Sequence, residues 1–229
     1  MHVPDGFLDA PTSLATGAAA VACVGVSLIK ARTELDDKTA PMAGLVAAFI
    51  FAVQMLNFPV ANGTSGHLLG GALAAVLVGP WTAVLCMSTV FIVQCLLFAD
   101  GGITALGTNI MLMGVTTVAV GWLVFRLLQV VLPKKLSVVP VAAGVAAFVS
   151  VPVAALLFVA LYAVGGTADI PIASLATAMV GVHLLIGIGE GVITFLAIGA
   201  ILAVRPDLVY GARRVLAARE LEIRTGVSA

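Results

Sequence analysis

Long apolar runs separated by short polar segments make up almost the whole chain. The runs are Ala10–Lys30, Pro41–Asn57, His67–Gly79, Trp81–Phe98, Leu106–Leu132, Val138–Val164 and Leu175–Val204. A helix needs about 20 apolar residues to cross the hydrocarbon core of a membrane. The third run is short, so we expect it to be tilted, re-entrant, or continued past Pro80, which should kink or end a helix. The pattern predicts an all-α integral membrane protein with a seven-helix transmembrane bundle.

Composition supports this fold class. The 229 residues are 62% hydrophobic and 10% charged, with a mean hydropathy of +1.20, whereas soluble domains carry about 25% charged residues. The net charge of zero gives no indication of a nucleic-acid partner. Cys23, Cys86 and Cys95 lie inside apolar runs and are expected to be small buried hydrophobes. The first basic residue, Lys30, follows the first apolar run, so no secretory signal is expected.

The distribution of charge predicts the orientation of the bundle. The polar segments on one side carry all 11 basic residues: Lys30, Arg32, Lys38, Arg126, Lys134, Lys135, Arg205, Arg213, Arg214, Arg219 and Arg224. Met1–Asp9, Phe58–Gly66, Ala99–Ala105 and Gly165–Ser174 carry none. Basic residues favour the cytoplasmic side. We therefore expect one transmembrane domain over 1–229 in a bacterial or archaeal cytoplasmic membrane, with residues 1–9 outside and a cytoplasmic tail over 205–229.

The first two residues form a potential chelate. The Met1 amine, the His2 amide nitrogen and the His2 imidazole Nδ1 can close a five-membered and a six-membered ring on one metal ion. Planar nitrogen sets favour Ni²⁺ or Cu²⁺, and affinity rises towards them through Co²⁺. Because any chain that begins Met-His has this arrangement, a solvated terminal histidine is the alternative.

A second outward histidine strengthens the metal hypothesis. His67 follows the turn Gly63-Thr64-Ser65-Gly66 at the predicted start of the third helix, and it offers a fourth nitrogen. Pro4 and Gly6 should turn the N-terminal segment back towards the outer mouth of the bundle. From the residues alone, a metal site made by Met1, His2 and His67 is one hypothesis, and solvated histidines remain the alternative.

Other polar residues near membrane depth have two interpretations each. Asp5 and Asp100, with Ser65 and Asn109, are candidates to orient the ligands or attract a cation, and the carboxylates are equally plausible as solvated caps. His183 and Glu190 are seven residues apart and share a helix face. They form either a proton or ion path or a structural polar pair, and we favour the structural interpretation. A carrier or channel that used this pair without an ATPase is the main alternative function.

The motifs, taken together, resemble the CbiM/NikM family, the substrate-binding membrane components of energy-coupling factor (ECF) transporters for cobalt and nickel. The matching stretches are Met1–Leu8, Asn57–Val60, Gly63–Gly71, Gly79–Trp81, Phe98–Gly102 and Leu106–Asn109. The resemblance implies that Met1, His2 and His67 hold the metal and that the N-terminal segment plugs the substrate chamber. It also implies uptake of Ni²⁺ or Co²⁺ as substrate, with no organic cofactor.

The same resemblance implies partners, because the chain has no Gly-x-x-x-x-Gly-Lys-Ser/Thr motif and is not expected to be an enzyme. These are an ATPase pair, a coupling transmembrane subunit and a small accessory membrane subunit. Val3-Pro4-Asp5-Gly6 and Gly66-His67-Leu68 are closer to nickel members than to the Ile-Met-Glu-Gly and Ser-His-Pro stretches of cobalt members, which favours nickel modestly. An intramembrane hydrolase using Ser65 and His67 is disfavoured, because no acidic third residue has suitable spacing.

Overall fold

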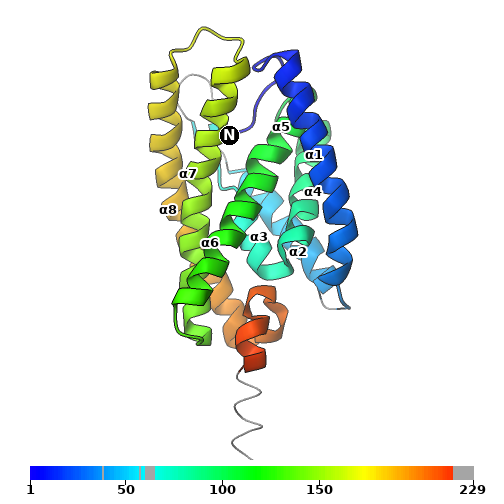
Figure 1. The fold of residues 1–229 in the computed structure, drawn as a ribbon, viewed down its shortest axis with the longest axis vertical. Helices are drawn as coiled ribbons and strands as arrows, with labels where there is room; N and C mark the ends of the chain where they lie inside the picture. The colour runs from blue at the N-terminus through cyan, green and yellow to red at the C-terminus, as the bar shows by residue number, and fades with distance from the viewer. Residues whose placement is uncertain (38, 57, 60–64, 219–229) are drawn as a thin grey trace, which may run out of the picture.

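A computed structural model describes residues 1–37, 39–56, 58–59 and 65–218. Within these ranges, five helical runs are long and apolar enough to cross a membrane, and they lie side by side along the long axis in Figure 1. They are α1 (Ala10–Lys30), α4 (Pro80–Phe98), the run of α5 (Leu106–Asn109), the π-helix η3 (Ile110–Thr116) and α6 (Thr117–Val131), α7 (Val139–Gly165) and α8 (Ile172–Val204). The prediction of an all-helical membrane fold is confirmed at this level.

Two further apolar helices are shorter than a membrane span. Helix α2, Thr39–Gln54, has 16 residues, and α3, Gly71–Val78, has 8. At a rise of about 1.5 Å per residue, α3 is only about 12 Å long. The prediction of a third span from His67 is therefore wrong over its first residues, and the seven crossings and the outward N-terminus stay predictions.

His67 lies in an irregular segment before α3 and not in the helix. The two-residue strand β2, Ser65–Gly66, pairs antiparallel with β1, Phe58–Pro59. Gly70 then has φ +83°, a left-handed conformation that favours glycine, and it caps α3. The chain can pack this irregular segment at membrane depth because protein surrounds it: His67 and Leu69 are completely buried.

Local chemistry determines where the other helices begin and end. The Asp9 carboxylate accepts a hydrogen bond from the Thr12 amide at 2.9 Å, and Pro11 occupies the first turn of α1. Pro80 starts α4, and Ala99 ends it in a left-handed conformation with φ +52°. Helix α7 continues through Pro152.

Small residues bring the helices close together. A Cβ atom added to Gly144 of α7 would lie 2.9 Å from the Gly191 carbonyl oxygen of α8, and one added to Gly121 of α6 would lie 2.5 Å from the Ala72 Cβ of α3. Such close approach is how membrane helices gain van der Waals contact in lipid.

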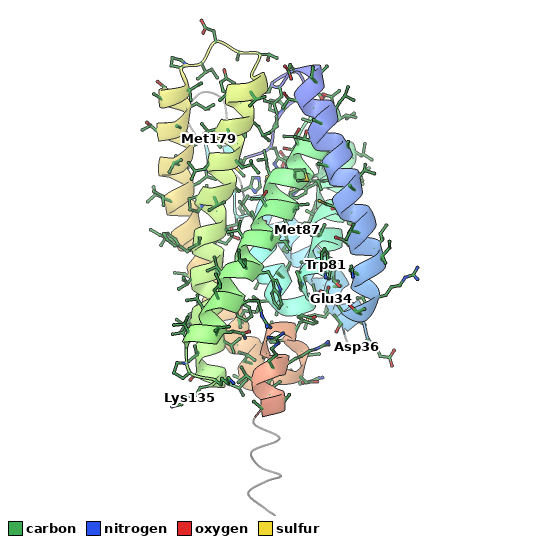
Figure 2. All side chains as sticks on the ribbon, viewed as in Figure 1. Glu34, Asp36, Trp81, Met87, Lys135 and Met179 are labelled. Atoms are coloured by element: carbon green, nitrogen blue, oxygen red, sulfur yellow. The ribbon has the colours of Figure 1, made fainter. Side chains whose placement is uncertain are left out.

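Buried and charged groups mark the lower end of the bundle in Figure 2, where Glu34, Asp36 and Lys135 are labelled. Glu34, which is 2% exposed, accepts hydrogen bonds from the Thr82 amide at 2.7 Å and the Trp81 amide at 3.2 Å at the start of α4. Burial raises the pKa of this carboxyl group, against the effect of those bonds.

The described part of the tail packs against the same end. Short 3₁₀ turns cover Pro206–Leu208 and Tyr210–Ala212, and Arg213 bonds to Asp36 at 2.7 Å. Arg219 and Arg224, in the predicted cytoplasmic tail, lie outside the described residues.

The close contact at Gly121 predicts opposite effects for two glycine substitutions. Gly121→Ala should lower the free energy of unfolding by about 1–3 kcal/mol, because the added methyl overpacks the contact with Ala72. Gly25→Ala in α1 is the matched control, because no atom lies within 4 Å of the added Cβ and alanine favours a helix by up to about 1 kcal/mol. Thermal unfolding in detergent checks this, and equal effects of the two substitutions would contradict the packing.

Candidate metal site

The first nine residues fold back from the start of α1 into the bundle, where the N label lies in Figure 1. The segment is held beside the end of α7, since the Asp9 amide donates to the Gly165 carbonyl at 2.7 Å and the Thr167 amide donates to the Phe7 carbonyl at 3.1 Å. Met1 and Val3 are 1% and 0% exposed. The chain terminus, usually a mobile charged group, is therefore part of the protein core.

Val3 is the main anchor of this N-terminal segment. Its amide donates to Asn109 Oδ1 at 2.8 Å, and its carbonyl accepts from Asn109 Nδ2 at 3.2 Å and from the Gly102 amide at 2.9 Å. One asparagine side chain thus pairs with both main-chain groups of Val3. Asn109 therefore bonds to the backbone that follows His2, and its predicted role at a metal site stays a prediction.

Glycines allow the segment to come this close. Gly101 has φ +92°, and a Cβ added there would lie 2.8 Å from Asn109 Nδ2 and 3.2 Å from His2 Cδ2. Asp5 accepts from the Thr104 amide at 2.7 Å and from its hydroxyl at 2.5 Å, which lowers the pKa of the Asp5 carboxyl. Asp5 therefore fastens the segment to the loop after α4 and does not contact either histidine.

The two histidines predicted as ligands meet. His2 Nδ1 and His67 Nε2 are 3.1 Å apart, and the ring centroids are 4.7 Å apart. His67 Nδ1 lies 2.9 Å from the Leu68 carbonyl oxygen, which can only accept, so Nδ1 carries the proton and Nε2 a lone pair. His2 Nε2 lies 3.1 Å from Gln94 Oε1, an acceptor, which leaves the lone pair of His2 on Nδ1.

A carboxylate oxygen also lies beside His2 Nδ1. Asp100 Oδ1 is 3.2 Å from His2 Nδ1, and Asp100 Oδ2 is buried with no hydrogen-bond partner among the described residues. With the lone pair of His2 on Nδ1, this contact is not an ion pair at neutral pH. His2 Nδ1 therefore lies within 3.2 Å of two other electron-rich atoms, His67 Nε2 and Asp100 Oδ1.

Burial keeps the nitrogen groups neutral. It lowers the pKa of the Met1 amine from 8.0 to about 5, although Asp100 opposes this. Burial, with the charge of the amine, lowers the pKa of His2 from 6.5 to about 4. The pKa of His67 is also well below its usual value, because the ring is buried beside the Met1 amine and His2. Neutral nitrogens are the form that binds metal.

Side chains alone do not complete a metal site here. Among the described residues, no group of three or more His, Cys, Asp or Glu side chains is arranged to hold a metal ion. A four-nitrogen site at these two histidines would use main-chain nitrogens, such as those of the buried Met1 and His2.

The remaining predicted residues lie in different places. The Ser65 side chain lies outside the described residues. His183 and Glu190 are both buried in α8 but do not bond to each other: His183 Nδ1 bonds to the Met179 carbonyl at 2.7 Å, and Glu190 bonds to backbone amides before α3.

Two site residues were missed by sequence reasoning. Gln94 contacts His2, and Gln54 contacts Gln94 at 2.9 Å, and both side chains are fully buried. From the sequence, neither glutamine is assigned to the site. Their position, as single amides within apolar helices, was the available signal, because a buried amide requires partners.

The fold is similar to that of solved membrane transporters for transition metals. A crystal structure of a truncated transition metal transporter has a TM-score of 0.81 and 31% identity, covering 89% of this chain and 99% of that one. A relative from Haloquadratum walsbyi, whose name assigns it to metal transport, is 39% identical over 92% of this chain and 94% of its own. The cobalt transport protein CbiM of Sorangium cellulosum is 34% identical over 91% and 94%.

The sequence profile of the CbiM family, described as the cobalt uptake substrate-specific transmembrane region, matches residues 2–208. The chain belongs to this family. The predicted resemblance to the CbiM/NikM family is confirmed.

The anchor at Val3 predicts that Asn109 keeps the N-terminus buried. Asn109→Ala removes both side-chain bonds to Val3, so the Met1 amine should become reactive towards an acylating reagent at pH 7. Mass spectrometry of the N-terminal peptide measures this, with exposed Lys30 as the internal reference for reagent strength. A wild-type amine that reacts as fast as the variant's would contradict the docked position.

Proposed function

We propose that this protein captures Ni²⁺ or Co²⁺ as the substrate-specific component of an uptake transporter. The ligands are the Met1 amine, the His2 amide nitrogen, His2 Nδ1 and His67 Nε2. The observation that carries the proposal is the 3.1 Å approach of two imidazole nitrogens whose lone pairs face each other beside the buried start of the chain.

The spacing of these atoms supports a shared metal ion. Imidazole nitrogens bind first-row divalent metals at about 2.0–2.1 Å, so adjacent ligands at a right angle are about 2.9 Å apart. His2 Nδ1 and His67 Nε2 are already close to that separation. Little rearrangement of the rings is then needed on binding, and such preorganisation increases affinity.

The donor chemistry favours nickel or cobalt over hard cations. Mg²⁺ and Ca²⁺ prefer oxygen ligands, whereas a planar set of four nitrogens suits Ni²⁺. A relative from Rhodobacter capsulatus is named a fused nickel transport protein and is 42% identical over 56% of this chain and 37% of its own. With the sequence at residues 3–6 and 66–68, this supports nickel as the preferred substrate.

The orientation in the membrane belongs to the proposal. The site faces the outside of a bacterial or archaeal cytoplasmic membrane, the C-terminus faces the cytoplasm, and the bundle crosses seven times. The ends of α1 and α6 and the start of the tail lie at the end of the bundle opposite the N-terminus in Figure 1, and these segments carry basic residues. Energy for release comes from a partner ATPase pair through a coupling transmembrane subunit, with a small accessory membrane subunit.

Ligand substitutions test the proposed site. One extra residue at the N-terminus converts the Met1 amine into an amide and should abolish nickel binding, and His2→Ala should do the same. His67→Ala should weaken binding by about 100-fold while three nitrogens remain. His183→Ala is the matched control and should bind as wild type, because its ring bonds to Met179. Titration followed by visible absorption measures this, and tight binding by the extended protein would exclude the chelate.

The lowered pKa of the N-terminal amine predicts the proton balance of binding. At pH 7 a buried amine with a pKa of about 5 has no proton to lose, so nickel should release about one proton, from the His2 amide. An undocked amine with a pKa of 8.0 would add nearly one more. Calorimetry in buffers of different ionisation enthalpy measures the number.

The same shifts predict the pH dependence. The docked segment binds fewer protons than an undocked one, so docking should weaken as the pH falls from 8 towards 5, and nickel affinity should fall with it. Release of about two protons at pH 7 would contradict the neutral, docked amine.

A further inference from the structure

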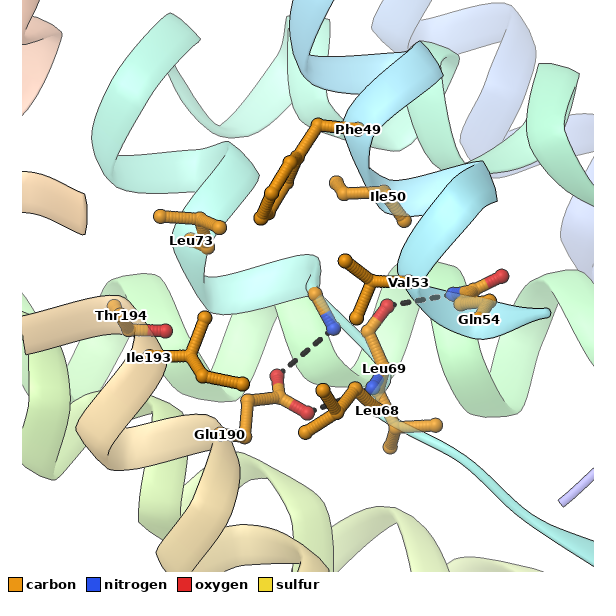
Figure 3. A pocket seen from close by; sticks show the side chains of 11 residues that line it. Phe49, Ile50, Val53, Gln54, Leu68, Leu69, Leu73, Glu190, Ile193 and Thr194 are labelled. Atoms are coloured by element: carbon orange, nitrogen blue, oxygen red, sulfur yellow. Dashed lines mark hydrogen bonds between the residues drawn. The ribbon is translucent and has the colours of Figure 1, made fainter. Parts of the chain in front are cut away.

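A chain of hydrogen bonds connects His2 to the segment that carries His67. His2 Nε2 donates to Gln94 Oε1 at 3.1 Å, Gln94 Nε2 donates to Gln54 Oε1 at 2.9 Å, and Gln54 Nε2 donates to the Leu69 carbonyl at 2.7 Å. Figure 3 shows the last of these bonds beside a small apolar cavity. All four residues of the chain are buried or nearly so, and water does not compete for these groups.

The direction of this chain is determined at its Leu69 end. A backbone carbonyl can only accept, so the Gln54 NH₂ group must face it and the Gln54 oxygen must face Gln94. Gln94 then presents its NH₂ group to Gln54 and its oxygen to His2. An oxygen at that position requires the His2 proton on Nε2, which leaves Nδ1 with the lone pair that faces His67.

Glu190 holds the other side of the same residue. Its two carboxyl oxygens accept from the Leu69 amide at 2.7 Å and the Gly70 amide at 2.9 Å, as Figure 3 shows. Glu190 is 2% exposed and projects from α8. Leu69, whose carbonyl ends the chain of hydrogen bonds, is therefore fixed to α8 by its amide, and it lies two residues after His67.

We propose that Gln54, Gln94 and Glu190 are positioning residues for metal capture, which fix the Nε2–H tautomer of His2 and the place of His67 together. The metal function rests on the proposed site, but the tautomer of His2 does not. In this proposal, the role of the buried hydrogen-bond chain is to direct the lone pair of His2 Nδ1 towards that of His67 Nε2. Partners of metal-binding histidines typically change affinity by about 10–100-fold when removed.

The tautomer is measured directly in the metal-free protein. With ¹⁵N-labelled histidine, only His2, His67 and His183 contribute imidazole signals, and alanine variants assign them. At pH 7 the wild type should show His2 protonated on Nε2. Gln54→Leu, which touches neither histidine, should give a mixture of both tautomers, because the Gln94 amide can then turn. His2 protonated on Nδ1 in wild type, or an unchanged tautomer in Gln54→Leu, would overturn the proposal.

The effect on nickel binding is tested by substituting two matched carboxyl groups. Glu190→Gln should lower nickel affinity by about 10–100-fold and shift the visible spectrum of bound nickel towards that of His67→Ala. Glu34→Gln is the control, because Glu34 is equally buried and also accepts from two backbone amides at a helix start, at the opposite end of the bundle. It should keep wild-type affinity and spectrum even where its melting temperature falls.

These measurements distinguish the positioning role of Glu190 from the metal binding itself. Equal losses of affinity in Glu190→Gln and Glu34→Gln, or wild-type affinity and spectrum in Glu190→Gln, would show that Glu190 acts only on stability. Wild-type protein that binds neither nickel nor cobalt would reject the proposed function, whereas the ¹⁵N result would still decide whether the chain of bonds sets the tautomer.

Discussion

The burial of the chain terminus is the constraint on which the rest of the structure depends. A charged amine and an imidazole lose hydration when they enter a helical bundle, and the neutral forms that burial favours are metal ligands. Asn109 and the Gly102 amide bond to the backbone of Val3. These bonds fix the backbone next to His2, so the His2 ring lies directly against the His67 ring. The N-terminal segment and the segment before α3 both pack closely inside the bundle. This close packing requires glycine at position 101, which has a positive φ and lies against His2 and Asn109.

Two buried carboxyl groups serve as fixed links between helices at opposite ends. Glu34 joins the end of α1 to the start of α4, and Glu190 joins α8 to the start of α3. Glu34 accepts amides of the first turn of α4, which a helix start leaves without partners. Glu190 accepts the amides of the two residues before α3. In lipid such groups have no water to bond, so one side chain from a neighbouring helix stabilises the whole junction. The link at α8 holds the segment that carries His67, so the proposed metal site lies next to the longest helix of the described chain.

Hydrophobic length predicted the long helices closely, because lipid imposes one requirement on every span. It failed at His67–Gly79, where a run of apolar residues is irregular for its first residues and helical only from Gly71. Run length cannot distinguish a lipid-facing helix from a segment buried inside protein. His2 and His67 were predicted from their chemistry, whereas the roles of Gln54 and Gln94 were not, because contacts across 92 and 40 residues leave no local pattern. The paired interpretation of His183 and Glu190 followed helix periodicity, but each residue bonds to a different backbone group.

The most direct test of the central claim is X-ray absorption spectroscopy of the nickel-loaded protein with its native N-terminus. We expect four nitrogen ligands in a planar arrangement. The imidazole contribution to the spectrum should fall when His67 is replaced by alanine. A six-coordinate site rich in oxygen, or a spectrum that is unchanged in His2→Ala, would contradict a site built from the start of the chain.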